Sequence, residues 1–314
     1  MKSQHIVCMD LGGTNVRLGL VDSRGIVVRR RRVKMVDFDE KADLYVWLGE
    51  IVEAFAASGK DLARPKGVSI GFAGPTKSRA GLVYYAPNIG RFTNLEVRSR
   101  LERMLDMPVV VENDANCAAL GEFWRGAGRG TKSLFLFTVG TGIGGSFIID
   151  GEVWQGEDGI AGEIGHTVVM AGGPRCSCGK GGCLEALVSA TAIVRDYCRT
   201  RKGLACKASG SITAKMVFDR ARGGDKAARS VITRSARALG IGIANVFHLL
   251  NPELILVGGG VSRAGSLLLR PAVDEARSMV FPPLKALLKV RRTTLGDDAG
   301  LIGAAYLGFK KLRT

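Results

Sequence analysis

The sequence lacks any apolar run of the length needed to cross a bilayer. Its first apolar run, residues 6–9, is interrupted by Asp10 and is too short for a signal peptide. A linker rich in proline or serine is missing as well. The lack of an apolar span and of a signal peptide predicts a cytoplasmic protein with no membrane partner. Without such a linker, the composition does not indicate where a domain boundary lies.

Aromatic residues are scarce, at 6% of the chain, although the formal net charge is +16. Basic side chains are scattered over separate segments, at residues 29–32, 98–103, 285–292 and 310–313, and aromatic side chains do not interleave with them as they do on a base-stacking surface. Solvated basic faces therefore account for the charge better than a nucleic-acid partner, which we do not expect.

The chain has seven cysteines, an odd number, and their distribution argues against a secreted disulfide scaffold. Cys176, Cys178 and Cys183 fall within eight residues, and His166 precedes them. One imidazole nitrogen and three thiolates make a closed tetrahedral donor set suited to structural Zn²⁺. We therefore predict a zinc site in a protein of a reducing compartment.

The length of 314 residues suggests two domains, and 46% apolar residues suffice to build their cores. Hydrophobic patterning predicts that each half begins with a β-hairpin turning at glycines and continues with alternating helices and strands. The expected strands are 6–9, 16–21, 26–33, 68–72, 109–111, 133–139, 146–150, 254–257 and 288–292. The expected helices are 41–57, 95–105, 184–198, 213–222, 227–250, 270–279 and 299–312.

This duplicated pattern predicts an α/β protein with two domains and a cleft between them. We place the domains at residues 1–118 and 119–298, with the boundary inside the helix that follows the strand 109–111. The zinc segment then belongs to the second, larger domain. The C-terminal residues 299–314 are expected to pack back on the first domain as a helix.

The turn of the first hairpin has the composition of a phosphate-binding loop. Gly12 and Gly13 let backbone N–H groups approach an anion closely. Thr14 and Asn15 can add side-chain donors. Asp10, at the end of the preceding strand, can hold Mg²⁺ through water. For a Gly-Gly turn alone, a plain hairpin is the competing interpretation.

The second hairpin turns at the glycine-rich residues 140–145. This loop lacks the Gly-Lys-Ser/Thr ending of a Walker loop, and it is no Rossmann fingerprint because a strand follows it rather than a helix. Three glycines after the strand 254–257 could admit an adenine or a ribose, although a tight turn explains them equally well. We expect the loops to clamp ATP, with contacts from Thr141, Gly142, Gly258, Gly259 and Gly260.

Asp114 is the candidate general base. It follows the strand 109–111 at the start of a helix, where Asn113 and Asp114 are also ordinary N-cap residues. Phosphoryl transfer needs positioning and charge neutralisation more than covalent chemistry. One carboxylate that takes the proton of an acceptor hydroxyl therefore suffices beside Mg²⁺.

Glu163 and Glu185 flank the predicted zinc segment. Carboxylates accept paired hydrogen bonds from sugar hydroxyls, and the imidazole of His166 can bind zinc with one nitrogen and a hydroxyl with the other. In this interpretation zinc holds a sugar pocket rigid and takes no part in the chemistry.

At residues 10–15, 112–114, 140–145, 163–185 and 258–260 the chain resembles the ROK family of bacterial sugar kinases and related repressors, and the resemblance extends over nearly the whole chain. The resemblance implies an actin-like, ribonuclease H-like ATPase fold. Within the family, the chain is most similar to the ATP-dependent glucokinases, which implies the phosphorylation of glucose to glucose 6-phosphate. ATP, Mg²⁺, structural Zn²⁺ and a homodimer or homotetramer are implied as well. Asp114 is then the base, and the implied hexose ligands are Gly74, Asn113, Asp114, Glu163, His166 and Glu185.

One departure from the family leaves the substrate open. Residues 86–92 carry Arg91 and Phe92 where many glucokinases have a proline–glycine–tryptophan run, so mannose, fructose, N-acetylglucosamine and N-acetylmannosamine are alternatives to glucose. The phosphoryl donor is open between ATP, ADP and polyphosphate. A repressor of the family needs a helix-turn-helix domain, for which Asp10 lies too near the start of the sequence, and an actin-type scaffold has no use for the zinc segment.

Overall fold

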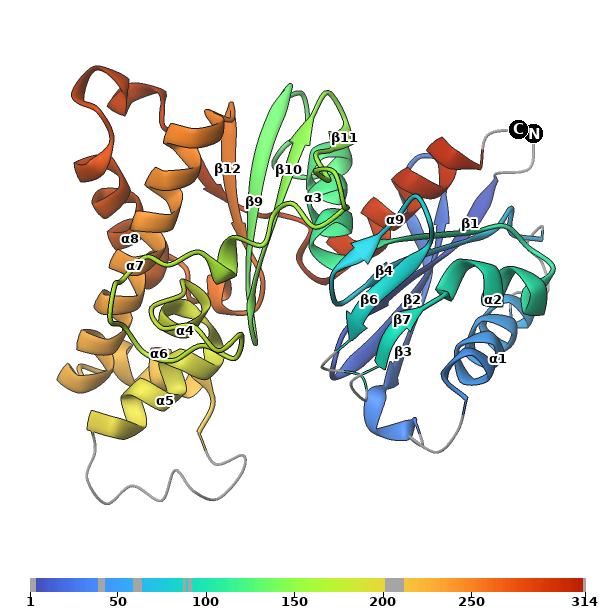
Figure 1. Cartoon of the computed structure of the whole chain (residues 1–314), viewed down its shortest axis with the longest axis horizontal. Helices are drawn as coiled ribbons and strands as arrows, with labels where there is room; N and C mark the ends of the chain where they lie inside the picture. Colours follow the sequence, from blue (N-terminus) through green and yellow to red (C-terminus); the bar gives the residue numbers. More distant parts are fainter. Residues whose placement is uncertain are drawn as a thin grey trace. The chain divides into compact units, whose positions relative to one another are not determined.

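The computed structural model of the chain describes residues 4–38, 43–58, 64–86, 89, 92–200 and 212–312 (Figure 1). The chain forms two compact units. The first comprises Met1–Lys132, Phe147–Ala161 and Thr294–Thr314, and the second comprises Ser133–Ser146 and Gly162–Thr293.

A mixed five-stranded sheet forms the centre of the first unit. Its members are β1 (His5–Leu11), β2 (Asn15–Asp22), β3 (Val27–Lys34), β4 (Val68–Phe72) and β8 (Val109–Asn113), in the order β3-β2-β1-β4-β8. β1 and β2 form an antiparallel hairpin, β3 extends it, and β4 and β8 add in parallel. All five lie where the hydrophobic pattern predicts strands.

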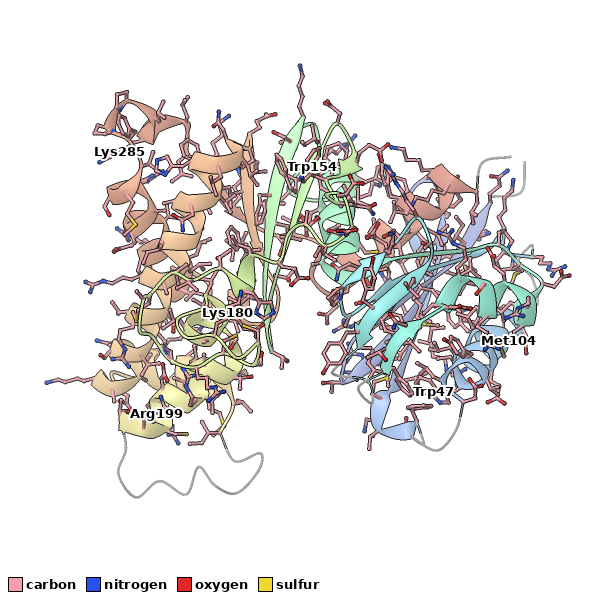
Figure 2. All side chains as sticks on the ribbon, viewed as in Figure 1. Trp47, Met104, Trp154, Lys180, Arg199 and Lys285 are labelled. Atoms are coloured by element: carbon pink, nitrogen blue, oxygen red, sulfur yellow. The ribbon has the colours of Figure 1, made fainter. Side chains whose placement is uncertain are left out.

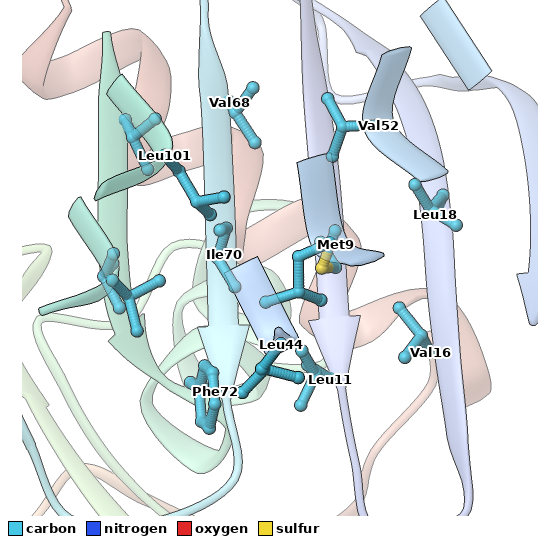
Figure 3. Close-up of a cluster of buried hydrophobic side chains, with 14 of the residues drawn as sticks. Met9, Leu11, Val16, Leu18, Leu44, Val52, Val68, Ile70, Phe72 and Leu101 are labelled. Carbon is cyan, nitrogen blue, oxygen red and sulfur yellow. The ribbon is translucent and has the colours of Figure 1, made fainter. Parts of the chain in front are cut away.

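The main core of this unit lies on one face of the sheet. Helices α1 (Leu44–Ala57) and α2 (Val97–Leu105) cover that face, and their side chains pack with Met9, Leu11 and Ile70 of the strands (Figure 3). Because alternate residues of a strand face opposite sides, Asp10 points away from this core. The sheet period thus decides which helices the Asp10 carboxylate meets.

Helices α3 (Asp114–Arg125) and α9 (Ala299–Lys311) pack together in the first unit, and α9 also packs on β1 and β4. Their backbones approach closely through glycines. A Cβ on Gly303 would lie 1.6 Å from the carbonyl oxygen of Cys117, and one on Gly121 would lie 2.1 Å from that of Ala299. The C-terminal helix therefore packs on the helix that begins at Asp114, and the predicted domain boundary at residue 118 falls inside α3.

A second sheet of three short strands was not predicted. It consists of β5 (Thr76–Lys77), β6 (Leu82–Ala86) and β7 (Phe92–Leu95). Two to five residues carry too little alternation to be recognised. Leu95, expected to begin a helix, ends β7 instead, and α2 starts at Val97.

The other five-stranded sheet has the order β11-β10-β9-β12-β13. Its strands are β9 (Ser133–Val139), β10 (Ile143–Ile149), β11 (Glu152–Val153), β12 (Leu254–Gly258) and β13 (Val290–Arg292). β12 lies parallel to both β9 and β13. The helices of the second unit are α4 (Glu185–Val188), α5 (Ala190–Thr200), α6 (Ala214–Arg222), α7 (Lys226–Leu250) and α8 (Ser266–Met279).

Three expectations for this part of the chain are wrong in detail. β10 begins at Ile143 rather than at residue 146, so the glycine loop is shorter than predicted. The predicted helix 184–198 is interrupted at Ser189, whose extended backbone starts a new helix and whose hydroxyl accepts the Ala192 N–H at 3.1 Å. Helix α8 begins at Ser266, four residues before the predicted start, and continues past Pro271.

Candidate functional site

The turn between β1 and β2 is a tight hairpin with an exposed tip. The Gly12 N–H donates to the carbonyl oxygen of Asn15 at 3.1 Å, while Gly13 and Thr14 at the tip are exposed. The carbonyl oxygen of Thr14 accepts the Met35 N–H at 3.0 Å, which braces the turn from outside. The structure thus shows a tight hairpin turn whose tip is exposed.

Asp10 is placed beside this turn by its cross-strand partner. Arg17 stands directly opposite it on β2 and donates to Asp10 Oδ2 at 2.8 Å. On the other side, a Cβ on Gly300 would lie 3.0 Å from Asp10 Cγ, so the first turn of α9 leaves room for the carboxyl group. Burial raises the pKa of Asp10, and the charge of Arg17 opposes that rise. Arg17 also lies 3.7 Å from Asp297 Oδ1, so a second carboxylate stands near Asp10.

The strand-to-helix junction after β8 separates two roles that the sequence left open. Asn113 is the N-cap of α3: its Oδ1 accepts the N–H groups of Ala115 at 2.9 Å and Asn116 at 3.2 Å. Its Nδ2 donates to the carbonyl oxygen of Gly74 at 3.1 Å. Asp114 occupies the first helical turn, where the helix dipole favours a carboxylate.

Gly74 is a glycine for steric reasons. Its φ is +137°, and a Cβ there would lie 2.2 Å from the carbonyl oxygen of Tyr85. The backbone after β4 is therefore held against β6 on one side and bonded to Asn113 on the other. Gly74, Asn113 and Asp114, all predicted hexose ligands, come together in the first unit.

The glycine loop of the second unit is built around Glu185. The Gly140 N–H donates to the carbonyl oxygen of Gly142 at 2.9 Å, and the Ile143 N–H donates to Glu185 Oε2 at 3.0 Å. A Cβ on Gly142 would lie 2.5 Å from the same Glu185 oxygen. Thr141 at the tip is exposed, and its carbonyl oxygen accepts the Thr191 hydroxyl at 3.2 Å.

The three glycines after β12 reach the base of that loop. Gly259 has φ +85°, and a Cβ on it would lie 2.5 Å from the carbonyl oxygen of Val139, the residue before Gly140. A Cβ on Gly260 would meet no atom within 4 Å, so this glycine faces open space. The structure therefore brings Gly259 against Val139, at the strand end that leads into the glycine loop.

His166, Cys176, Cys178 and Cys183 form one cluster, with ligand atoms that all lie within 4.8 Å of one another. The Cys178 and Cys183 sulfurs are 3.6 Å apart, and Cys176 Sγ lies 3.7 Å from His166 Nδ1. Zinc with bonds of about 2.3 Å to sulfur and about 2.0 Å to nitrogen requires tetrahedral edges of about 3.7 and 3.5 Å. The donor set and its spacing therefore fit Zn²⁺.

The loop that carries the cysteines is preorganised by its backbone. It turns at Lys180, whose carbonyl oxygen accepts the Cys176 N–H at 2.7 Å (Figure 2). The Lys180 N–H in turn lowers the pKa of the exposed Cys178 thiol to about 7. Burial raises the pKa of Cys183 to about 12. Gly179 and Gly182, with φ of +90° and +79°, make the turns that bring Cys183 back.

Glu163 and Glu185 lie on either side of this cluster in the chain, and each is tied to it. The His166 N–H donates to the carbonyl oxygen of Glu163 at 3.1 Å. The Ser177 hydroxyl donates to Glu185 Oε1 at 3.2 Å. Burial raises the pKa of the Glu163 carboxyl, the nearby His166 lowers it, and Glu185 adds to the rise.

Arg17 and Ser177 were not singled out in the sequence. Arg17 was detectable, because hairpin register places it opposite Asp10. Ser177 was not, since its contact depends on how the cysteine loop meets α4. Arg91 of the loop 86–92 lies outside the described residues, as do residues 41–42 of the first predicted helix, and Phe92 begins β7.

The chain belongs to the ROK family, whose family model matches residues 6–311. It is 37% identical to a glucokinase of Halalkalibacterium halodurans over 98% of this chain and 96% of that protein. It is 36% identical to a glucokinase of Thermotoga maritima over 98% of both chains. Among solved structures it is similar to a ROK family glucokinase from Streptomyces griseus in complex with glucose and AMPPNP, with a TM-score of 0.81 and 33% identity over 96% of this chain and 98% of that one.

The relatives are not all glucokinases. At 30% identity they include an N-acetylmannosamine kinase of Escherichia coli and a xylose repressor of Caldicellulosiruptor bescii. The first is matched over 96% of this chain and 97% of that protein, and the second over 95% and 76%. The comparisons confirm the predicted family and the two-domain, actin-like α/β fold. In the described part of the chain, no helix is long and apolar enough to span a membrane.

Proposed function

We propose that this protein is an ATP-dependent hexose kinase and that its preferred acceptor is glucose, which it converts to glucose 6-phosphate. The observation that carries the proposal is that Glu185 is hydrogen-bonded both to the loop of the His166, Cys176, Cys178 and Cys183 cluster and to the glycine loop. An ATPase without a polyhydroxylated substrate has no need of this arrangement. The glucokinase relatives, one of them solved with glucose and AMPPNP, support the same activity.

The hexose in this proposal is bound through its hydroxyl groups. The carboxylates of Glu163 and Glu185 accept pairs of hydroxyl hydrogen bonds. His166 directs Nδ1 toward the cysteine sulfurs, which leaves Nε2 as the nitrogen for a hydroxyl. Gly74 and Asn113 are also proposed hexose ligands, and the hydrogen bond from Asn113 Nδ2 to the Gly74 carbonyl oxygen fixes the Asn113 amide.

Asp114 acts as the general base. Its carboxylate takes the proton of the acceptor hydroxyl while the hydroxyl oxygen attacks the γ-phosphorus in line, and the bond to the β-phosphate oxygen breaks to release ADP. Asp10 would hold Mg²⁺, which neutralises charge on the phosphates. The nucleotide is expected at Gly12, Gly13, Thr14, Asn15, Thr141, Gly142, Gly258, Gly259 and Gly260.

Zinc in this proposal is structural. His166, Cys176, Cys178 and Cys183 would hold it, and a closed set of four protein ligands leaves no position for substrate. An assembly of two or four copies is the oligomer we propose, which sedimentation of the purified protein would measure.

The test is a coupled ADP-release assay with Mg-ATP against glucose, mannose, fructose, N-acetylglucosamine and N-acetylmannosamine. Fastest turnover with glucose supports the proposal as stated. A preference for N-acetylmannosamine, the substrate named for one relative, would keep the mechanism and change the acceptor. Hexose binding without turnover would instead favour a regulator, the role named for another relative. Replacing ATP by ADP or polyphosphate identifies the donor.

A further inference from the structure

Glu112 is a buried carboxylate to which the proposed mechanism gives no part. It is 1% exposed and stands at the end of β8, immediately before Asn113. Its Oε1 accepts the Asn113 N–H and the Asn116 Nδ2 donor, each at 2.9 Å. Its Oε2 accepts the Gln155 Nε2 donor at 2.7 Å. A buried carboxylate bonded to three donors is strongly held, because charge-assisted hydrogen bonds strengthen where water is excluded.

The two oxygens serve different parts of the first unit. Oε1 binds the junction from which Asn113 and Asp114 project. Oε2 binds Gln155, which follows the exposed Trp154 after β11 (Figure 2). Glu112 thus joins the junction between β8 and α3 to Gln155, which lies 43 positions further along the chain.

Gln155 begins a loop that leads directly to a proposed hexose ligand. Its carbonyl oxygen accepts the Ala161 N–H at 3.0 Å, which closes the loop 155–161 on itself. A Cβ on Gly159 would lie 2.9 Å from the carbonyl oxygen of Thr76, so the loop also rests on β5. Ala161 is the last residue of this segment of the first unit, and Glu163 follows two positions later.

We propose that Glu112 and Gln155 are a positioning pair for the hexose site. Neither is a catalytic residue. Glu112 orients the junction that carries Asn113 and Asp114 through Oε1, and Gln155 holds Glu112 in place through Oε2. The inference rests on the proposed hexose kinase activity and adds two residues that set its hexose affinity.

The substitution Gln155→Glu tests the contact through its pH dependence. It places a second carboxyl group within hydrogen-bonding distance of Glu112 Oε2, where both cannot stay ionised. At low pH the protonated new group donates its O–H to Glu112, and the contact survives. As pH rises and the shared proton is lost, the carboxylates repel. We expect kcat/KM for the hexose to fall about 10- to 100-fold between pH 6 and pH 8.5, a decline absent from the wild type.

The exchange Glu112→Gln with Gln155→Glu supplies the rescue. The amide oxygen at position 112 can still accept from Asn113 and Asn116, and the amide nitrogen replaces Oε2 and donates to the carboxylate at position 155. The three hydrogen bonds are kept and one charge moves across the contact. We expect kcat/KM within about threefold of wild type, without the new pH limb. The control Glu157→Gln alters an exposed charge in the same loop and should leave both properties unchanged.

The kinetic constants separate positioning from a general loss of stability. A positioning role raises the hexose KM of Gln155→Glu while the KM for ATP stays within about twofold, since Glu112 holds the junction that carries Asn113, a proposed hexose ligand. If the Gln155→Glu protein is folded and active and its hexose KM and pH profile are unchanged, the positioning role of the pair is refuted. The proposed kinase activity is not affected by that result. An exchange variant that folds but is no better than Gln155→Glu also overturns it. A wild-type protein that phosphorylates no hexose refutes both proposals together.

Discussion

The Ile143 N–H donates to Glu185 Oε2 at 3.0 Å, so a backbone group of the glycine loop is bound by a proposed hexose ligand. The other oxygen, Oε1, accepts the hydroxyl of Ser177, which lies between two cysteines of the metal cluster. One carboxylate in the second unit therefore joins the glycine loop to the cysteine loop. Under the proposed function, Glu185 therefore connects a proposed hexose-binding group with a loop proposed to bind nucleotide.

Glu185→Gln should consequently impair both substrates. The amide retains the size of the side chain but loses the charge that holds the Ile143 N–H and the hexose hydroxyls. We expect the KM for hexose to rise about 10- to 100-fold and the KM for ATP about threefold, measured by the coupled assay. Glu53→Gln on the exposed face of α1 is the control. A raised hexose KM with an unchanged ATP KM would show that the two loops are not connected through Glu185.

Asp114→Asn tests the general base. The amide is close in shape to the carboxylate but cannot accept the hydroxyl proton, so kcat should fall roughly 10²- to 10⁴-fold. Hexose affinity, measured by calorimetry, should stay within about threefold because Asn113 still caps α3. Turnover near the wild-type rate would remove Asp114 from the mechanism.

Cys178→Ser tests the metal cluster. The wild-type protein should contain about one zinc per chain by elemental analysis, and the variant well below that. Because zinc binding contributes directly to folding free energy, the variant should also unfold at a lower temperature. Ser177→Ala alters the neighbouring residue without removing a ligand and should keep its zinc. A zinc-free wild type with full activity contradicts the assignment.

Gly303→Ala tests the contact of α3 with α9. The added Cβ would lie 1.6 Å from the carbonyl oxygen of Cys117, so the helices must separate. We expect a loss of at least about 3 kcal/mol in the free energy of unfolding, measured in urea. In the control Gly223→Ala, the nearest atom to the new Cβ is 3.5 Å away, and stability should change by less than about 1 kcal/mol.

Asp22 should make stability depend on pH. Burial tends to raise its pKa, but hydrogen bonds from the Ile26 N–H and from Arg24 outweigh that effect, and the pKa of Asp22 lies below its ordinary value. Because its pKa is lowered on folding, the ionised Asp22 carboxylate stabilises the folded state at pH values above the ordinary pKa of about 3.9. This stabilisation is lost as the pH falls through the lower pKa of the folded state.

Asp22→Asn should therefore cost about 1–2 kcal/mol at pH 7 and progressively less below about pH 4. Urea unfolding of the wild type and of Asp22→Asn, at pH 7 and below about pH 4, measures the difference in the free energy of unfolding. A gap that widens in acid would reverse the assigned sign. Asp274→Asn, at an exposed position of α8, should show no such dependence.

The sequence alone led to most of the elements that carry the site. Short, nearly continuous apolar runs placed β1, β4 and β9, and a long apolar periodicity placed α7. Residues with distinctive chemistry at short spacing, such as Cys176, Cys178 and Cys183, identified their own cluster. Such signals lie within a few residues of one another, so they can be recognised in the sequence without knowledge of the fold.

Tertiary structure decided what distant segments do to one another. The strands β5, β6 and β7 are too short to show a hydrophobic pattern, and the close approach of Gly74 to Tyr85 of β6 depends on the fold. Asn113 rather than Asp114 proved to be the helix cap, which depends on one backbone angle at the end of β8.

What the sequence by itself determined is the chemistry available: a carboxylate at Asp114, a four-ligand metal set, glycine turns after strands. What only the fold decided is which of these groups meet: Arg17 with Asp10, Glu185 with Ile143, and Glu112 with Gln155. The reason is physical. Composition and periodicity act over one turn or one strand, whereas a hydrogen bond between residues 43 positions apart depends on the packing of everything between them.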